Sequence, residues 1–294
     1  MTLQAVADRV SAGNRVTEAD ARILFESRDL IAVGSLADDV RRRLHGARTT
    51  FVRVFEIHVD APPGSLPSSL VAGEIRLVGS PATLEAAIAA VAAARKLSGS
   101  VFLTGFSLRD LTRWDVPLDE AAARLSEAGL DALAEVPLDA VDDPAAVTAV
   151  RDRGLNAYRL TVHTYGDVSP AAMLGRAVEL QNSAGDFRAF APLPRTLSAI
   201  TPTTGYDDVK LVAVARLMAA VIPSIQVDWP LYGPKLAQVA LTMGADDVDG
   251  IAAADPAALG VRRTALSEIT GNIRAAALEP VERNGRFEPI LGAG

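Results

Sequence analysis

The chain has 294 residues, 49% hydrophobic and 22% charged, as expected for a globular protein with a sizeable core. Its formal net charge of −7 argues against nucleic acid or an anionic membrane as partner, because both favour clustered Lys and Arg. It contains no cysteine, which excludes disulfides, thiolate metal sites and cysteine nucleophiles, and its three histidines form no metal-binding motif.

The N-terminal segment, residues 1–14, contains Asp8 and Arg9 and lacks the basic start and apolar core of a signal peptide. The longest apolar stretch, residues 211–222, is interrupted by Arg216 and is too short to cross a bilayer. We therefore expect a cytoplasmic protein that contacts neither membrane nor nucleic acid.

Residues 1–50 are expected to form an N-terminal helical extension. Thr17 and Asp20 have the spacing of a capping box, and apolar residues recur at helical spacing over residues 29–44. Residues 51–59 then alternate β-branched or aromatic residues with polar ones, which predicts a strand.

From residue 51 to residue 294 we expect a single structural unit in which short strands alternate with longer helices. Strands are predicted at residues 74–78, 101–103, 130–136, 156–163, 187–192, 225–229 and 248–252. Helices are predicted at residues 82–97, 118–128, 144–153, 170–184, 206–221, 234–243 and 265–277. This alternation is typical of βαβ units with parallel strands and favours a (β/α) barrel, closed or partial.

Several sequence blocks stand in register within residues 203–250. They read T-T-G-Y-D-D, A-V-A-R-L, an isolated Trp229, G-P-K-L-A-Q and G-A-D-D-V-D-G. They resemble the radical S-adenosylmethionine (SAM) enzymes of menaquinone and deazaflavin biosynthesis, the family of aminofutalosine synthase, cyclic dehypoxanthine futalosine synthase and the FO synthase subunits. Weaker resemblance covers most of the remaining chain. It implies a radical SAM-type (β/α) barrel, partial with six units, behind the helical extension.

The chain departs from this family wherever the family holds its cofactors. The family's C-x-x-x-C-x-x-C loop binds an iron–sulfur cluster, but here residues 60–65 read D-A-P-P-G-S. The family's SAM-contacting glycine segment is replaced by residues 134–138, A-E-V-P-L, and its Y-G-H-x-E motif by residues 165–169, Y-G-D-V-S. We therefore expect no cofactor and no radical reaction.

Candidate site residues lie where the predicted strands end, because barrel sites are built at the carboxyl ends of the strands. His163, with Tyr165 and Asp167 close behind it, is a candidate acid–base group, although a hydrogen-bonded structural histidine is the simpler interpretation. The candidate ligand-binding residues are Thr104, Arg195, Asp228 and Trp229, and for Trp229 core packing is an equal alternative.

Two acidic groups near the C-terminal blocks have structural interpretations. Asp207 and Asp208 stand at a helix start, where carboxylates satisfy free N–H groups. Asp246, Asp247 and Asp249 form an acidic run for which a turn is favoured over a hard-cation site.

Three functions remain open from the sequence. The leading hypothesis is a catalytically inactive homologue, a pseudoenzyme, that acts by binding: as a hetero-oligomer with an active menaquinone-pathway enzyme, as a homodimer, or with a nucleoside-like ligand. The alternative is a metal-free hydrolase or lyase of the futalosine pathway that uses His163. The third is a small-molecule sensor with a pocket around Trp229.

Overall fold

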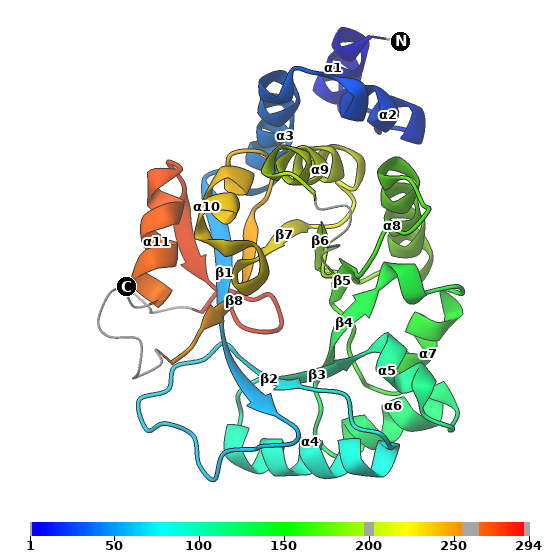
Figure 1. The fold of residues 1–294 in the computed structure, drawn as a ribbon, viewed down its shortest axis with the longest axis vertical. Coiled ribbons are helices and arrows are strands. Elements are labelled where there is room, and N and C mark those ends of the chain that lie inside the picture. The colour runs from blue at the N-terminus through cyan, green and yellow to red at the C-terminus, as the bar shows by residue number, and fades with distance from the viewer. Residues whose placement is uncertain (1, 197–202, 255–264, 291–294) are drawn as a thin grey trace.

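Nine parallel strands form the centre of the computed structural model, which describes residues 2–196, 203–254 and 265–290 (Figure 1). They run in the order β2-β3-β4-β5-β6-β7-β8-β1-β9, and β1 also pairs with β2. The strands are β1 Arg48–His58, β2 Glu74–Val78, β3 Leu103–Ser107, β4 Ala132–Pro137, β5 Arg159–Val162, β6 Ala189–Pro194, β7 Ser224–Asp228, β8 Asp247–Ala252 and β9 Glu279–Glu282. Strands β1 to β8 therefore close into a parallel barrel.

Closure depends on β1, which has 11 residues and divides one of its edges between two neighbours. Its C-terminal half, Val54–His58, pairs with β2, and its N-terminal part, Arg48–Phe51, pairs with β9. Its other edge pairs with β8. The ninth strand thus extends the wall below β2 without opening the barrel.

The helices surround the barrel as an outer layer (Figure 1). They are α1 Leu3–Ser11, α2 Glu18–Glu26, α3 Leu30–His45, α4 Leu84–Ser98, α5 Leu108–Arg113, α6 Leu118–Glu127, α7 Ala145–Asp152, α8 Pro170–Ala184, α9 Gly205–Met218, α10 Trp229–Leu241 and α11 Ala265–Ala275. None of the helices in the described ranges is long and apolar enough to cross a membrane.

The first three helices precede the barrel and pack outside its own helical layer, where α3 contacts α9 and α2 contacts α8 and α9. The predicted capping box is present: the Thr17 hydroxyl accepts the Asp20 N–H, and the Asp20 carboxylate accepts the Thr17 N–H. Val33 and Leu24 are fully buried in the core. These helices extend one side of the barrel with a second layer.

The predicted barrel is confirmed, with one correction: it is closed and has eight strands, where a partial barrel of six units was expected. Three elements of the described residues were missed: the short helix α5, the 3-10 helix η1 Leu138–Ala140 and the strand β9. The helix expected at residues 234–243 begins earlier, at Trp229, and is broken at Gly233, whose φ of 77° is not helical.

A buried ion pair joins this helical layer to the barrel. Arg216 of α9 is fully buried, forms an ion pair with Asp246, and donates to the carbonyl oxygens of Gly244 at 2.9 Å and Pro223 at 3.2 Å. Asp246 also accepts the backbone N–H of Ile225 at 2.9 Å. The guanidinium therefore neutralises the carboxylate that links the starts of β7 and β8.

We predict that Arg216→Met lowers the free energy of unfolding by about 3–5 kcal/mol, because it leaves a buried carboxylate without its counter-ion. Urea unfolding measures this loss. The matched control is Arg42→Met, which removes an exposed ion pair with Asp38 and is expected to cost less than about 1 kcal/mol. Equal losses in the two variants would contradict the assigned role of Arg216.

Candidate functional site

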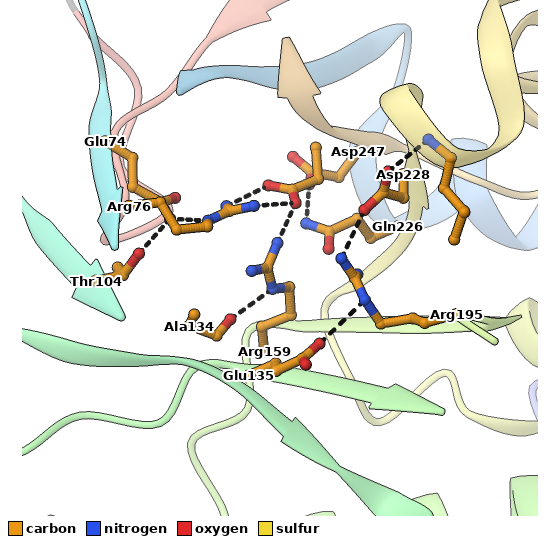
Figure 2. A network of polar contacts seen from close by, with 12 residues as sticks. Glu74, Arg76, Thr104, Ala134, Glu135, Arg159, Arg195, Gln226, Asp228 and Asp247 are labelled. Atoms are coloured by element: carbon orange, nitrogen blue, oxygen red, sulfur yellow. Dashed lines mark hydrogen bonds and ion pairs between the residues drawn. The ribbon is translucent and has the colours of Figure 1, made fainter. Parts of the chain in front are cut away.

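Charged and polar side chains fill the interior of the barrel, where Val, Ile and Leu are usual. Figure 2 shows them converging from several strands, linked by hydrogen bonds and ion pairs. They are Thr50, Glu74, Arg76, Thr104, Glu135, Arg159, Gln226, Asp228, Asp247 and Asp249 on the strands, with Arg195 and Arg283 just beyond β6 and β9. The groups lie at three levels along the barrel axis.

Asp249 is the centre of the middle level. It is 1% exposed, accepts from both terminal nitrogens of Arg76 at 2.9 Å, and forms an ion pair with Arg159. Glu74 accepts from Arg76 at 2.7 Å and from the Thr104 hydroxyl at 2.6 Å. Although burial opposes ionisation, the two guanidinium groups hold the pKa of Asp249 well below its usual range. Asp249 is therefore ionised at any physiological pH.

Asp247 is the centre of the lower level, toward the N-terminal ends of the strands. Its carboxylate accepts two hydrogen bonds from Arg283, at 2.6 and 2.7 Å, one from Gln226 at 2.7 Å and one from Thr50 at 2.5 Å. Arg283 is 2% exposed and follows β9 directly. The C-terminal segment thus closes the lower end of the barrel.

The upper level lies at the carboxyl ends of the strands. The Glu135 carboxylate is 2.7 Å from His163 Nε2 and 3.2 Å from Arg195 Nε. Arg195 also lies 3.0 Å from Asp228, whose other oxygen accepts the Leu231 N–H at the start of α10. Burial alone would raise the pKa of Glu135, but the His163 hydrogen bond and the Arg195 charge outweigh it and lower the pKa to about 2.

A cavity of about 400 Å³ opens above this level, at the barrel mouth. Arginine dominates its lining: Arg76, Arg159 and Arg195 rise from the interior, and Arg109 and Arg113 come from α5. His163, Glu135 and Glu56 also line it. One terminal nitrogen of Arg195, Nη1, is buried and has no hydrogen-bond partner. The mouth is therefore suited to a ligand that presents hydrogen-bond acceptors or negative charge.

The three predicted acid–base residues do not form one group. His163 reaches the mouth and pairs with Glu135. Tyr165 donates its hydroxyl to the Pro192 carbonyl at 2.8 Å, and burial raises its pKa. Asp167 is exposed, and among these described residues no hydrogen bond or ion pair joins it to His163 or Tyr165. The carboxylate within reach of His163 is on β4, far away in sequence.

The predicted ligand-binding residues are divided. Arg195 and Asp228 meet at the mouth. Thr104 lies deeper and donates to Glu74. Trp229 is the first residue of α10, packs against the hydrophobic core and does not line the mouth cavity, so core packing describes it best.

Sequence reasoning missed Glu135, Arg76 and Arg159. A signal was present for the two arginines, because each interrupts an otherwise apolar strand, in E-I-R-L-V and Y-R-L-T-V. A charged residue at such a position predicts a polar barrel interior. Glu135 belongs to the segment that replaces the family's glycines, and only the fold brings it to His163.

The residues present do not fit the iron–sulfur cluster that the fold class implies. The loop between β1 and β2, residues 59–73, offers the carboxylate of Asp60 and the hydroxyls of three serines. The chain has no thiolate to offer anywhere. Thiolates are the usual cluster ligands, so the residues of this chain do not fit an iron–sulfur cluster.

Two solved structures of other proteins superpose on this fold. Methylornithine synthase matches with a TM-score of 0.64 and 15% identity, covering 94% of this chain and 97% of that one. The [FeFe]-hydrogenase maturase HydG of Carboxydothermus hydrogenoformans matches with a TM-score of 0.66 and 12% identity, covering 97% and 80%. At such identities the likeness concerns the fold alone.

Sequence comparison places the chain nearer to particular enzymes. Residues 187–291 match a family model described as the CofH/MqnC C-terminal region. The chain is 26% identical to aminodeoxyfutalosine synthase of Thermus thermophilus, over 97% of this chain and 95% of that enzyme. It is 23% identical to cyclic dehypoxanthine futalosine synthase of Streptomyces coelicolor, over 98% and 89%. The expected resemblance to menaquinone-pathway radical SAM enzymes is thus confirmed, for a homologue without cysteine.

The low pKa of Glu135 predicts a pH-dependent contribution to stability. Its pKa falls from 4.5 to about 2 on folding, so the contribution is present above about pH 4.5 and is lost as the pH falls toward 2. We expect Glu135→Gln to be less stable than the wild type by about 2–3 kcal/mol near neutral pH. That difference should shrink in acid, as measured by urea unfolding at several pH values.

The control is Glu56→Gln, which changes an exposed carboxyl group at the same cavity. Its stability difference from the wild type near neutral pH should be smaller than that of Glu135→Gln, because the side chain of Glu56 is exposed. A Glu135→Gln difference that does not depend on pH would show that the ion pairs of Glu135 do not stabilise the fold.

Proposed function

We propose that this protein is a catalytically inactive homologue of the menaquinone-pathway radical SAM enzymes, and that it acts by binding a nucleoside-like pathway compound at the barrel mouth. The observation that carries the proposal is the combination of a chain without cysteine and an arginine-lined cavity above a closed ionic interior. The first feature removes the radical chemistry. The arginine-lined cavity leaves a site where a ligand can bind.

The size and the charge of the mouth support binding. A volume of about 400 Å³ lies within the range of small-molecule sites. Arg195 is held by Glu135 and Asp228, which fix its orientation, while its Nη1 remains unpaired. A guanidinium oriented in this way presents donors to carboxylate, phosphate or carbonyl oxygens with little loss of side-chain freedom.

The choice of ligand rests on the relatives. Those aligned along nearly the whole chain are named for futalosine compounds, which gives aminodeoxyfutalosine and dehypoxanthine futalosine priority as ligands. A chorismate-derived enol ether, with its carboxylates, is the anionic candidate for the arginines. We further propose that an active pathway enzyme is the protein partner, if the chain acts within a hetero-oligomer.

Calorimetry on the purified protein with these compounds and with S-adenosylmethionine tests the proposal. We expect one pathway compound to bind with a Kd near 1 μM, about −8 kcal/mol, without turnover. Arg195→Gln should weaken binding at least ~10-fold, because it removes a charge-assisted donor. Arg109→Gln removes a charge from the edge of the mouth cavity without disturbing the ion pairs of Glu135. It should also weaken the binding of an anionic ligand.

The control is Arg188→Gln, an exposed arginine just before the N-terminal end of β6, remote from the mouth. It should bind as the wild type does. If no pathway compound binds, or if the Arg195 and Arg109 variants bind as tightly as the control, the mouth is not the ligand site.

One observation favours a second candidate, a metal-free hydrolase or lyase. His163 Nε2 lies 2.7 Å from Glu135 at the mouth, the arrangement in which a carboxylate orients a catalytic imidazole. Product formation from a futalosine compound, detected by chromatography and abolished in His163→Ala, would support this enzyme over the binding protein. Turnover unchanged in His163→Ala would remove His163 from the chemistry.

A further inference from the structure

A second, larger cavity lies beyond the carboxyl ends of β5 and β6, among the end of α2 and the starts of α8, α9 and α10. Its volume is about 800 Å³, and it shares no lining residue with the mouth. The walls are largely apolar and aromatic, contributed by α2, the loop after β5, α9 and α10. Six of its lining residues are Phe25, Tyr165, Leu211, Leu231, Tyr232 and Leu236.

Most polar groups around this cavity already have partners. The Tyr165 and Tyr232 hydroxyls donate to backbone carbonyl oxygens of β6 at 2.8 and 2.6 Å, so their rings remain as walls. Lys210 donates to the carbonyl oxygens of Phe25 and Ser27, at 3.0 and 2.7 Å. Asp207 completes the capping box at the start of α9.

Asp208 is the exception among the charged residues in the lining. It is 6% exposed, and its Oδ1 is buried without a hydrogen-bond partner. Burial raises the pKa of this carboxyl group, and so does the charge of Asp207, against a hydrogen bond from Thr203 that lowers it. Its position at the start of α9 was expected to satisfy free N–H groups, yet Asp207 fills that role, and among the described hydrogen bonds no backbone N–H donates to Asp208.

A buried carboxylate oxygen without a hydrogen-bond partner, such as Asp208 Oδ1, costs free energy unless a donor or a cation reaches it. The ammonium of Lys210 is already held by two carbonyl oxygens, so the described lining residues offer no free cation to Asp208. The aromatic walls suit a flat ring system and favour a nearby positive charge. We propose that this cavity binds a protonated aromatic amine, with its ring among Phe25, Tyr165 and Tyr232 and its ammonium group on Asp208.

This site is separate from the function proposed for the mouth, and its test uses two probes of nearly equal shape. Tryptamine carries an ammonium group, whereas tryptophol carries a hydroxyl at the same place on the same indole. For the wild type we expect tryptamine to bind at least ~10-fold more tightly than tryptophol, as measured by calorimetry or by NMR titration. In Asp208→Asn this preference should fall to about 1.

The preference is a ratio within each protein, so a general loss of folded protein does not change it. Asp152→Asn is the matched control, because it removes an equal charge from an exposed position on α7, and it should keep the wild-type preference. The proposal is overturned if tryptamine shows no binding at about 1 mM. An equal preference in the wild type and in Asp208→Asn would overturn it as well.

The urea concentration at which Asp208→Asn unfolds is a second measurement. It should change in opposite directions if Asp208 serves a ligand and if it stabilises the start of α9. A carboxylate kept for a ligand is strained in the free protein, so the variant should unfold at the same or a higher urea concentration. A carboxylate that stabilises the start of α9 would make the variant unfold at a lower concentration. The latter result, with tryptamine preference unchanged, would assign Asp208 to the helix alone.

Discussion

The rest of the barrel interior depends on the pairing of Asp249 with two arginines. Arg76 comes from β2, Arg159 from β5 and Asp249 from β8, so one carboxylate joins three strands that are not neighbours in the sheet. Removing either arginine would leave buried charge without full compensation, which is a large penalty in a medium of low polarity. The levels above and below have their own arginine pairs, Arg195 with Glu135 and Arg283 with Asp247.

This ionic interior determines what the barrel can do. Each acidic residue of the 246–249 run is held by arginine: Asp246 by Arg216, Asp247 by Arg283, and Asp249 by Arg76 and Arg159. Each of these carboxylates already has an arginine partner. A turn was expected for the run, but only Asp246 precedes the strand, whereas Asp247 and Asp249 lie within β8. What remains accessible is the upper level, where His163, Glu135 and Arg195 border the cavity.

The strand and helix alternation was predictable because it depends on local periodicity, and helix α8 was predicted with its observed bounds, Pro170–Ala184. Closure was not predictable, because it depends on β1 pairing with β2 and β9 along one edge, which no local pattern reports. The candidate site was likewise predictable only where local sequence determined it. His163 and Arg195 stood out as strand ends, but Glu135 acquires its role through contacts with His163, 28 residues away along the chain, and with Arg195, which is farther still.

Stability alone does not account for the groups at the mouth. An interior of well-packed aliphatic residues is often as stable as buried ion pairs, and barrels commonly use one. Asp249 and Asp247 have their hydrogen-bonding capacity largely satisfied, so their arginines serve the fold. Arg195 differs, because its Nη1 is buried and unpaired beside a cavity. This oriented donor, which the fold itself does not use, is the feature on which the proposed ligand binding rests.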